Sequence, residues 1–334
     1  GGGFRLALNY FAFALAATIL APLRCRGDYD CIFVYEPSPI TVGVPAVAMR
    51  ALKRAPLLFW VQDLWPESLS ATGAVKSPWI LRRVESLVRF LYARSDRILI
   101  QSRAFAPPIE ALGADAARIR YFPNSAEALY RPAAGAREAG LEPGLPPGFR
   151  VMFAGNIGAA QDFETILAAA ALLREETGIQ WLVLGDGRLR PWVEREIDSR
   201  GLHATFHLLG RYPPEAMPRF FARADAMLVT LRKEPIFALT LPAKVQSYLA
   251  CAKPIIAALD GEGARVVTEA GAGVAVPAED PAALAEAVLG LARQGANARQ
   301  AMGARGRAYF EQHFEREMLL SRLEGWMNEV KPAG

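Results

Sequence analysis

Short apolar runs alternate with stretches of helical periodicity along most of the chain. The runs predict buried strands at residues 31–35, 57–61, 97–100, 151–154, 180–184, 205–209, 226–230, 254–257 and 273–276. The 3.6-residue period predicts helices between most of them, at residues 41–53, 78–94, 162–175, 189–200, 214–222, 243–250 and 281–292. Two more helices are expected in the tail, with a break near Phe314. This alternation predicts an α/β protein with parallel sheets.

A stretch rich in Gly, Ala and Pro at residues 133–148 interrupts this pattern and is typical of an interdomain linker. A length of 334 residues also suggests about two domains. We therefore expect an N-terminal Rossmann-like domain at 1–132 and a second one at 149–312. A final helix is expected at 313–334, and it could pack back on the N-terminal domain.

The segment from Phe4 to Leu23 is almost uncharged and approaches the length of a membrane-spanning helix, but it contains Arg5 and Asn9. Three interpretations stay open: a buried domain helix, an interfacial amphipathic helix and a true span. Residues 78–97 join apolar side chains to four arginines, which suits docking on anionic headgroups. A solvated basic face packed on a sheet explains the same pattern equally well.

The formal charge of +4 and a sequence pI near 9.0 favour anionic partners such as phosphates or an acidic membrane surface. The basic residues are interleaved with acidic ones and no nucleic-acid motif occurs, so we expect no nucleic-acid partner. Three scattered cysteines predict no disulfide framework, and three dispersed histidines predict no metal centre.

Loops that follow strands carry the candidate chemistry, because helix N-termini and glycine-rich turns there can receive anions. Gly155 and Gly158 frame one such loop. Gly185 and Gly187 follow another strand, but Arg190 stands where the dinucleotide fingerprint needs its third glycine, which disfavours nicotinamide chemistry. Lys244, at the start of a predicted helix, could neutralise a pyrophosphate, although an isolated lysine is more often a solvated surface group.

Five segments of the second half resemble, in order, the nucleotide-sugar domain of retaining glycosyltransferases of family 4, which have the two-domain GT-B fold. They are FAGNIGAAQDFETILAAAALL, WLVLGDG, HLLGRYPPEAMPRFFARADAMLV, ALTLPAKVQSYLACAKPIIAALDGEG and VVTEAGAGVAVPAEDPAALAEAV. In the first half, VQDLWPESLSATGAV, LYARSDRILIQS and YFPNSAEALYRP resemble bacterial transferases that build O-antigen, capsule and colanic-acid repeats. The resemblance implies two Rossmann-like domains facing a cleft.

The implied reaction moves a hexosyl or N-acetylaminosugar group, with retention, from a UDP-sugar to a polyprenyl-diphosphate-linked glycan. The enzyme would work as a peripheral protein on the cytoplasmic face of the plasma membrane, with no cofactor and no metal. In this resemblance Asp63 and Glu234 are the catalytic candidates, although a helix-capping role explains Asp63 equally well. The implied donor-binding residues are Gly155, Asn156, Gln161, Arg211, Tyr212, Phe237, Ala238, Leu239, Lys244, Gln246 and Ser247.

Several positions depart from the family pattern. Asn156 and Gln161 stand where the family usually has Arg and Lys, so the phosphate site loses two positive charges. Ser247 stands where the family's second Glu holds the ribose, so this role passes to Gln246 or changes. The chain also enters directly at a helix, so we expect the N-terminal domain to lack its first strands.

Two rival functions remain on sequence grounds. A GT-B-type sugar-nucleotide epimerase would use the same cleft without an acceptor, but histidines are scarce. A catalytically inactive nucleotide-sugar-binding module would bind donor without turnover. A dehydrogenase is disfavoured because the fingerprint glycines are missing.

Overall fold

The chain forms two compact units in a computed structural model that describes residues 2–71, 75, 77–133 and 144–331. Unit 1 comprises the described parts of residues 1–123 and 317–334, and unit 2 comprises those of residues 124–316. Residues 134–143 of the predicted linker lie outside the described residues. By packing, residues 124–133 belong to unit 2, and the last helix belongs to unit 1.

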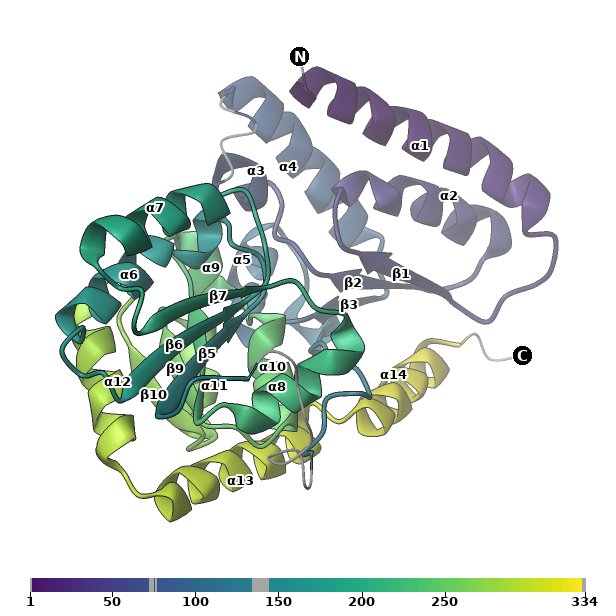
Figure 1. The fold of residues 1–334 in the computed structure, drawn as a ribbon. Helices are drawn as coiled ribbons and strands as arrows, with labels where there is room; N and C mark the ends of the chain where they lie inside the picture. Colours follow the sequence, from purple (N-terminus) through teal and green to yellow (C-terminus); the bar gives the residue numbers. More distant parts are fainter. Residues whose placement is uncertain (1, 72–74, 76, 134–143, 332–334) are drawn as a thin grey trace. The chain divides into compact units, whose positions relative to one another are not determined.

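Unit 1 is built on a four-stranded parallel sheet in the order β1-β2-β3-β4 (Figure 1). Its strands are β1 (Ile32–Glu36), β2 (Leu57–Val61), β3 (Arg97–Ile100) and β4 (Ile119–Tyr121). Its helices are α1 (Gly2–Arg24), α2 (Gly43–Lys53), α3 (Glu67–Ala71), α4 (Pro78–Ala93), α5 (Ala106–Ala111) and α14 (Arg316–Val330). The predicted strands β1 to β3 are confirmed within a residue, whereas β4, α3 and α5 were not predicted.

The C-terminal helix α14 packs on the sheet of unit 1. Leu319 and Leu323 join a buried apolar cluster with Leu58, Leu99 and Phe122, which are strand residues or follow a strand directly. Aromatic rings extend this cluster, because Phe122 lies 4.7 Å from the ring of Trp60 and 5.9 Å from that of Trp326. A sequence-distant helix therefore closes the apolar core of this unit.

Unit 2 contains a six-stranded parallel sheet in the order β10-β9-β8-β5-β6-β7. The strands are β5 (Phe149–Ala154), β6 (Ile179–Leu184), β7 (Phe206–Gly210), β8 (Ala226–Thr230), β9 (Ile255–Ala258) and β10 (Gly273–Val276). The helices are α6 (Phe163–Leu172), α7 (Arg190–Arg200), α8 (Met217–Arg223), α9 (Pro235–Leu239), α10 (Ala243–Ala250), α11 (Glu262–Glu269), α12 (Pro281–Arg293) and α13 (Ala296–His313). This is the strand order of a doubly wound sheet. From β5 the chain adds β6 and β7 on one side, and it then adds β8, β9 and β10 on the other side.

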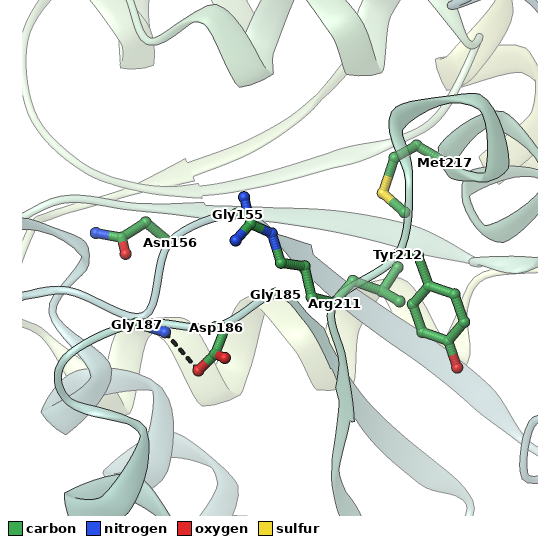
Figure 2. A pocket seen from close by; sticks show the side chains of 9 residues that line it. Gly155, Asn156, Gly185, Asp186, Gly187, Arg211, Tyr212 and Met217 are labelled. Atoms are coloured by element: carbon green, nitrogen blue, oxygen red, sulfur yellow. Dashed lines mark hydrogen bonds between the residues drawn. The ribbon is translucent and has the colours of Figure 1, made fainter.

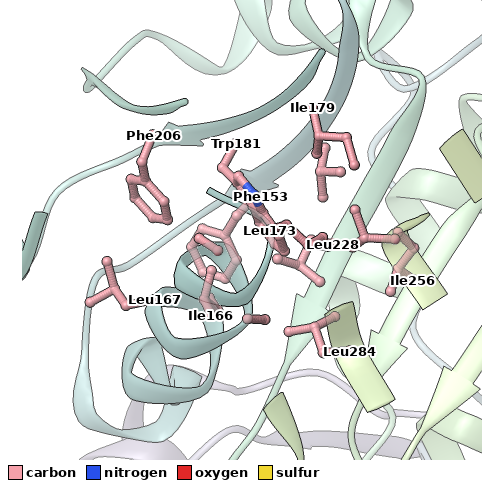
Figure 3. Close-up of a cluster of buried hydrophobic side chains, with 14 of the residues drawn as sticks. Phe153, Ile166, Leu167, Leu173, Ile179, Trp181, Phe206, Leu228, Ile256 and Leu284 are labelled. Atoms are coloured by element: carbon pink, nitrogen blue, oxygen red, sulfur yellow. The ribbon is translucent and has the colours of Figure 1, made fainter. Parts of the chain in front are cut away.

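The core of unit 2 explains its hydrophobic strands. Phe153 and Trp181 pack with Leu167 of α6 and Leu284 of α12 in one buried cluster (Figure 3). All six residues of β6 are buried, because helices cover both faces of a parallel sheet of this kind. The predicted α/β class with two parallel-sheet domains is confirmed.

Helix α1 buries little of its surface. Among the side chains described, only Ala14 is fully buried, and the helix packs along α2. Seven large apolar side chains of α1 are more than half exposed: Leu8, Phe11, Phe13, Leu15, Ile19, Leu20 and Leu23. Within the part of the chain that the structure describes, no helix is long and apolar enough to span a membrane.

Candidate functional site: a pocket at the strand ends of unit 2

The loops that follow β5, β6 and β7 surround a cavity of about 660 Å³ (Figure 2). This is the carboxyl edge of the sheet, where doubly wound domains bind their ligands. The lining residues are Gly155, Asn156, Leu184, Gly185, Asp186, Gly187, Arg211, Tyr212 and Met217. Three of these residues are glycines, which leave the backbone open to close approach by a phosphate.

Glycines allow these loops to approach one another closely. The Gly155 amide donates to the Leu184 carbonyl at 2.8 Å, and the Gly185 amide donates to the Gly210 carbonyl at 2.8 Å. Gly185 has φ +141°, and a Cβ atom there would lie 1.8 Å from the carbonyl oxygen of Gly155. The first loop can therefore lie on the second only because residue 185 has no side chain.

Lys244 lies beneath the Gly155 loop. A Cβ atom on Gly155 would meet the Lys244 Nζ at 2.8 Å, and this Nζ lies 3.8 Å from the centroid of the Phe153 ring. Among the described residues, no carboxylate or carbonyl pairs with the ammonium. Desolvation by burial lowers the pKa of Lys244 to about 7. The site thus holds a cation that lacks a counter-ion.

A second cavity of about 310 Å³ adjoins the first and shares Gly155 and Met217 with it. Lys244, Ser247, Tyr130 and Tyr248 are among its lining residues. Tyr248 is buried, and its hydroxyl accepts a hydrogen bond from the Ala154 amide at 3.3 Å. This contact fixes helix α10 to the end of β5, so the position of Lys244 relative to the glycine loop is well defined.

Arg211 and Tyr212 follow β7 and form one wall of the larger cavity. Arg211 is exposed, and Figure 2 shows its side chain extending from the strand end toward the Gly155 loop. The Tyr212 ring packs on Phe220 with centroids 4.5 Å apart, which leaves a rigid aromatic edge on the pocket. These two side chains offer a cation and a ring to a ligand.

The Asn156 side chain lies between the loop after β5 and the loop after β6. Cβ atoms on Gly158 and Gly187 would lie 2.4 Å and 2.6 Å from its side-chain amide atoms. Its side chain is nevertheless exposed to the cavity that it lines. Asn156 therefore combines a structural position between the loops with access to a ligand.

The structure does not bring all the predicted donor-site residues to these two cavities. Gln161 does not line either one, and the Gln161 carbonyl accepts a hydrogen bond from the Thr230 hydroxyl. Glu234 is exposed and precedes α9, the helix that contains Phe237, Ala238 and Leu239; none of these residues lines either cavity. They lie beyond the carboxyl end of β8, so their roles stay predictions.

The two predicted ribose candidates on α10 differ in exposure. Gln246 is fully buried, and within the described chain neither of its side-chain polar atoms has a hydrogen-bond partner. Ser247 is partly exposed, and its hydroxyl donates to the Ala243 carbonyl at 3.2 Å. Ser247 is therefore accessible from the smaller cavity, whereas Gln246 would reach a ligand only after rearrangement.

Asp63 belongs to unit 1, in the loop between β2 and α3. Its side chain is partly buried, and desolvation raises the pKa of its carboxyl above the usual value of 3.8. A raised pKa is typical of carboxyl groups that exchange protons at functional sites. The structure describes Asp63 only within its own unit.

Five lining residues of the larger cavity were not predicted as site residues; one of them, Leu184, is the last residue of β6 and was predicted only as part of a strand. Gly185, Asp186 and Gly187 were tested only against the dinucleotide fingerprint and set aside, although a glycine directly after a buried strand was a usable signal. Met217 gave no signal, since it is one apolar residue of a short helix.

Comparisons with known proteins agree with this architecture. The family model "Glycosyl transferase 4-like domain" matches residues 2–125, and the model "Glycosyl transferases group 1" matches residues 148–294. A curated relative, the probable glycosyltransferase WbjE of Pseudomonas aeruginosa, is 31% identical over 237 residues. That match covers 68% of this chain and 58% of the relative, so the aligned part spans little more than half of that protein.

Solved structures show the same fold at low identity. Anabaena Alr3699/HepE, determined in complex with UDP, is similar with a TM-score of 0.71 and 15% identity, covering 98% of this chain and 83% of that one. Sucrose-phosphate synthase from Thermosynechococcus elongatus gives a TM-score of 0.73 and 17% identity, with coverage of 94% and 77%.

The two parallel-sheet units and the two matching models define a protein of the GT-B class. The chain belongs to the family 4 type of glycosyltransferases, as its sequence motifs predicted.

Proposed function

We propose that this chain transfers a sugar from a UDP-sugar to a lipid-linked glycan and retains the anomeric configuration. The observation that carries the proposal is a partly buried lysine beside a glycine-lined cavity at the strand ends of unit 2, for which the described residues offer no counter-ion. A diphosphate supplies the missing negative charge, and the glycines let backbone amides approach its oxygens. HepE, whose structures were determined in complex with UDP and with UDP-glucose, supports the same ligand class.

In this proposal the bond between the anomeric carbon and the diphosphate oxygen breaks, and the acceptor hydroxyl oxygen bonds to the same carbon. Lys244 stabilises the charge that develops on the departing UDP, without a metal ion. Arg211 and Tyr212 contact the base, while Glu234 and residues 237–239 face the sugar. Asp63 orients the acceptor hydroxyl, whose proton leaves to the Asp63 carboxylate or to the departing diphosphate.

The proposed acceptor is a polyprenyl-diphosphate-linked glycan of surface polysaccharide synthesis on the cytoplasmic face of the membrane. The resemblance of the first-half motifs to O-antigen-type transferases and the similarity to WbjE support this assignment. An epimerase and a binding module without turnover are the rival outcomes that an experiment must separate.

The decisive experiment measures UDP release from a panel of UDP-sugars, with and without a lipid-linked acceptor in detergent. We expect release that depends on the acceptor, that is lost in Lys244→Ala, and that persists in Lys233→Ala, which removes an exposed lysine outside both cavities. Release without acceptor, or sugar isomerisation, would contradict the transfer. Donor binding with no release under any condition would support the binding module instead.

We also propose that unit 1 binds anionic membranes through α1 and α4. Leu8, Phe11, Leu15, Ile19 and Leu23 repeat every three or four residues along one face of α1, and all five are more than half exposed. On α4, Trp79 is 60% exposed, and Arg83 lies 5.3 Å from its ring. Exposed apolar area next to arginines matches the interface of an acidic bilayer.

Vesicle co-sedimentation tests this surface. Replacing both Phe11 and Ile19 by Ala is expected to weaken binding to vesicles of phosphatidylglycerol and phosphatidylcholine by at least about tenfold, because each large apolar side chain contributes about 1.5–3 kcal/mol on burial. The matched control is Leu172→Ala, which alters an isolated exposed leucine of unit 2. Equal binding by the double variant and the control would reject this surface.

A further inference from the structure

Glu36 is a buried carboxyl group at the carboxyl end of β1. It is 0% exposed, and within the described chain neither of its side-chain oxygens has a hydrogen-bond partner of normal geometry. Glu36 pairs in register with Val61 of β2, and its carbonyl accepts a hydrogen bond from the Gln62 amide at 3.1 Å. The Glu36 side chain therefore lies beside the loop that carries Asp63.

The charges around Glu36 favour its neutral form. Burial raises the pKa of Glu36 to about 9, and the negative charge of Asp63 adds to this increase. The backbone amides of Asp63 and Gln62 face the carboxyl group and lower its pKa, which offsets part of this increase. Glu36 is therefore protonated at neutral pH.

Among the described residues, no cation is paired with Glu36 or Asp63 to offset a second negative charge. Tyr92 of α4 is buried with its hydroxyl unpartnered among the described residues; burial raises its pKa, and Glu36 and Glu67 add to the increase. On α2, which packs against β1, Arg50 is paired with Asp96 and Lys53 donates to the Gly27 carbonyl. In the described chain, neither Glu36 nor Asp63 forms an ion pair, so ionisation of Glu36 would bury an uncompensated charge.

We propose that Glu36 and Asp63 form a carboxyl pair that holds one proton, and that Glu36 is the positioning residue that keeps Asp63 ionised and in place. The inference rests on the proposed function, in which Asp63 orients the acceptor hydroxyl. Neutral Glu36 supports the loop of Gln62 and Asp63 from inside the unit without repelling the Asp63 carboxylate. Loss of the Glu36 proton adds a buried negative charge that repels the Asp63 carboxylate and displaces the loop.

A titration tests the pair without any assay of transfer. In protein with ¹³C-labelled glutamate carboxyl groups, we expect one NMR resonance, absent in Glu36→Gln, to titrate at about pH 9 in the wild type. Asp63→Asn should lower that titration point, because it removes the neighbouring charge. Glu110→Gln, which neutralises an exposed carboxyl of the same unit, should leave the resonance unchanged. Titration near the usual 4.5, or no response to Asp63→Asn, would overturn the pair.

Thermal stability gives a second readout with a defined sign. The folded-state pKa of Glu36 lies above its usual value of 4.5. The stability that protonated Glu36 contributes to the wild type is therefore lost as the pH rises from about 4.5 to about 9. Glu36→Gln removes this loss, and its Tm should therefore gain on the wild-type Tm as the pH increases across that range. A constant Tm difference between the two proteins would contradict the proposal.

The positioning role requires transfer to be measured against pH. With UDP-sugar kept saturating at every pH, we expect acceptor kcat/KM of the wild type to decline above about pH 9, Glu36→Gln to abolish this decline, and Glu36→Ala to lose activity at every pH. A purely structural residue would lower activity without moving the pH profile. If no transfer occurs with any acceptor while the NMR titration is as expected, the proposed function fails and the carboxyl pair stands.

Discussion

Lys244→Met is expected to weaken UDP-sugar binding by at least about 30-fold, since removing one partner of a buried charge pair costs about 2–5 kcal/mol. The substitution keeps the length of the side chain and its packing on the Phe153 ring, but it leaves the diphosphate without its cation. Isothermal titration calorimetry measures the loss. Lys233→Met is the matched control, because it removes the same charge from an exposed position outside both cavities.

Lys244 should also make the binding of the donor depend on pH. Burial lowers the pKa of free Lys244 to about 7, whereas a bound diphosphate favours the ammonium and raises it again. Above about pH 7 the protein must take up a proton when donor binds, so affinity should fall by up to about tenfold per pH unit. A UDP-sugar is the right probe, since its diphosphate lacks the monoester group that titrates near pH 6.

Calorimetry in buffers of different ionisation enthalpy counts these protons. The wild type should take up close to one proton per donor well above pH 7, and Lys244→Met should take up none. Proton uptake that survives in Lys244→Met would assign the linkage to another group. Affinity that is flat from pH 7 to pH 9 would show that Lys244 is already fully charged in the free protein.

Most of the strands were predictable because they are short apolar runs, and the central ones are covered on both faces. All five residues of β8 are buried, and the predicted range 226–230 equals the observed one. Strand β4 was missed because Ile119–Tyr121 is a three-residue edge strand with no fully buried side chain, so neither run length nor alternation distinguishes it from a loop. Helix α9 has only five residues and offers too few turns for a period.

The loops that form the site could be predicted from the sequence, but the contacts between them could not. Gly155 and Lys244 stood out because a glycine follows a strand and a cation opens a helix. Their contact joins residues far apart in the chain, and only the doubly wound order brings the ends of β5 and α10 together. Glu36 gave no signal, because a charged residue at a strand end is normally solvated. Its burial depends on α3, α4 and the loop after β2, which no local pattern contains.

Gly185→Ala tests whether the close approach of the two glycine loops builds the donor site. A Cβ atom at this position would lie 1.8 Å from the Gly155 carbonyl oxygen and 2.9 Å from its carbon, both of them backbone atoms that no rotamer change can move away. The φ of +141° adds strain for any residue with a side chain. The loops after β5 and β6 must therefore separate, which widens the cavity where the diphosphate is proposed to bind.

We expect Gly185→Ala to lower the unfolding free energy by about 2–4 kcal/mol and the Tm by about 5–15 °C. Donor affinity should fall at least about tenfold, even at temperatures where the variant is fully folded. Gly178→Ala is the matched control, because Gly178 precedes the same strand and a Cβ atom there meets nothing within 4 Å. Differential scanning calorimetry and donor titration separate the two effects. Lost stability with unchanged donor affinity would place the diphosphate away from these loops, whereas joint loss in Gly185→Ala alone ties binding to the backbone geometry that glycine permits.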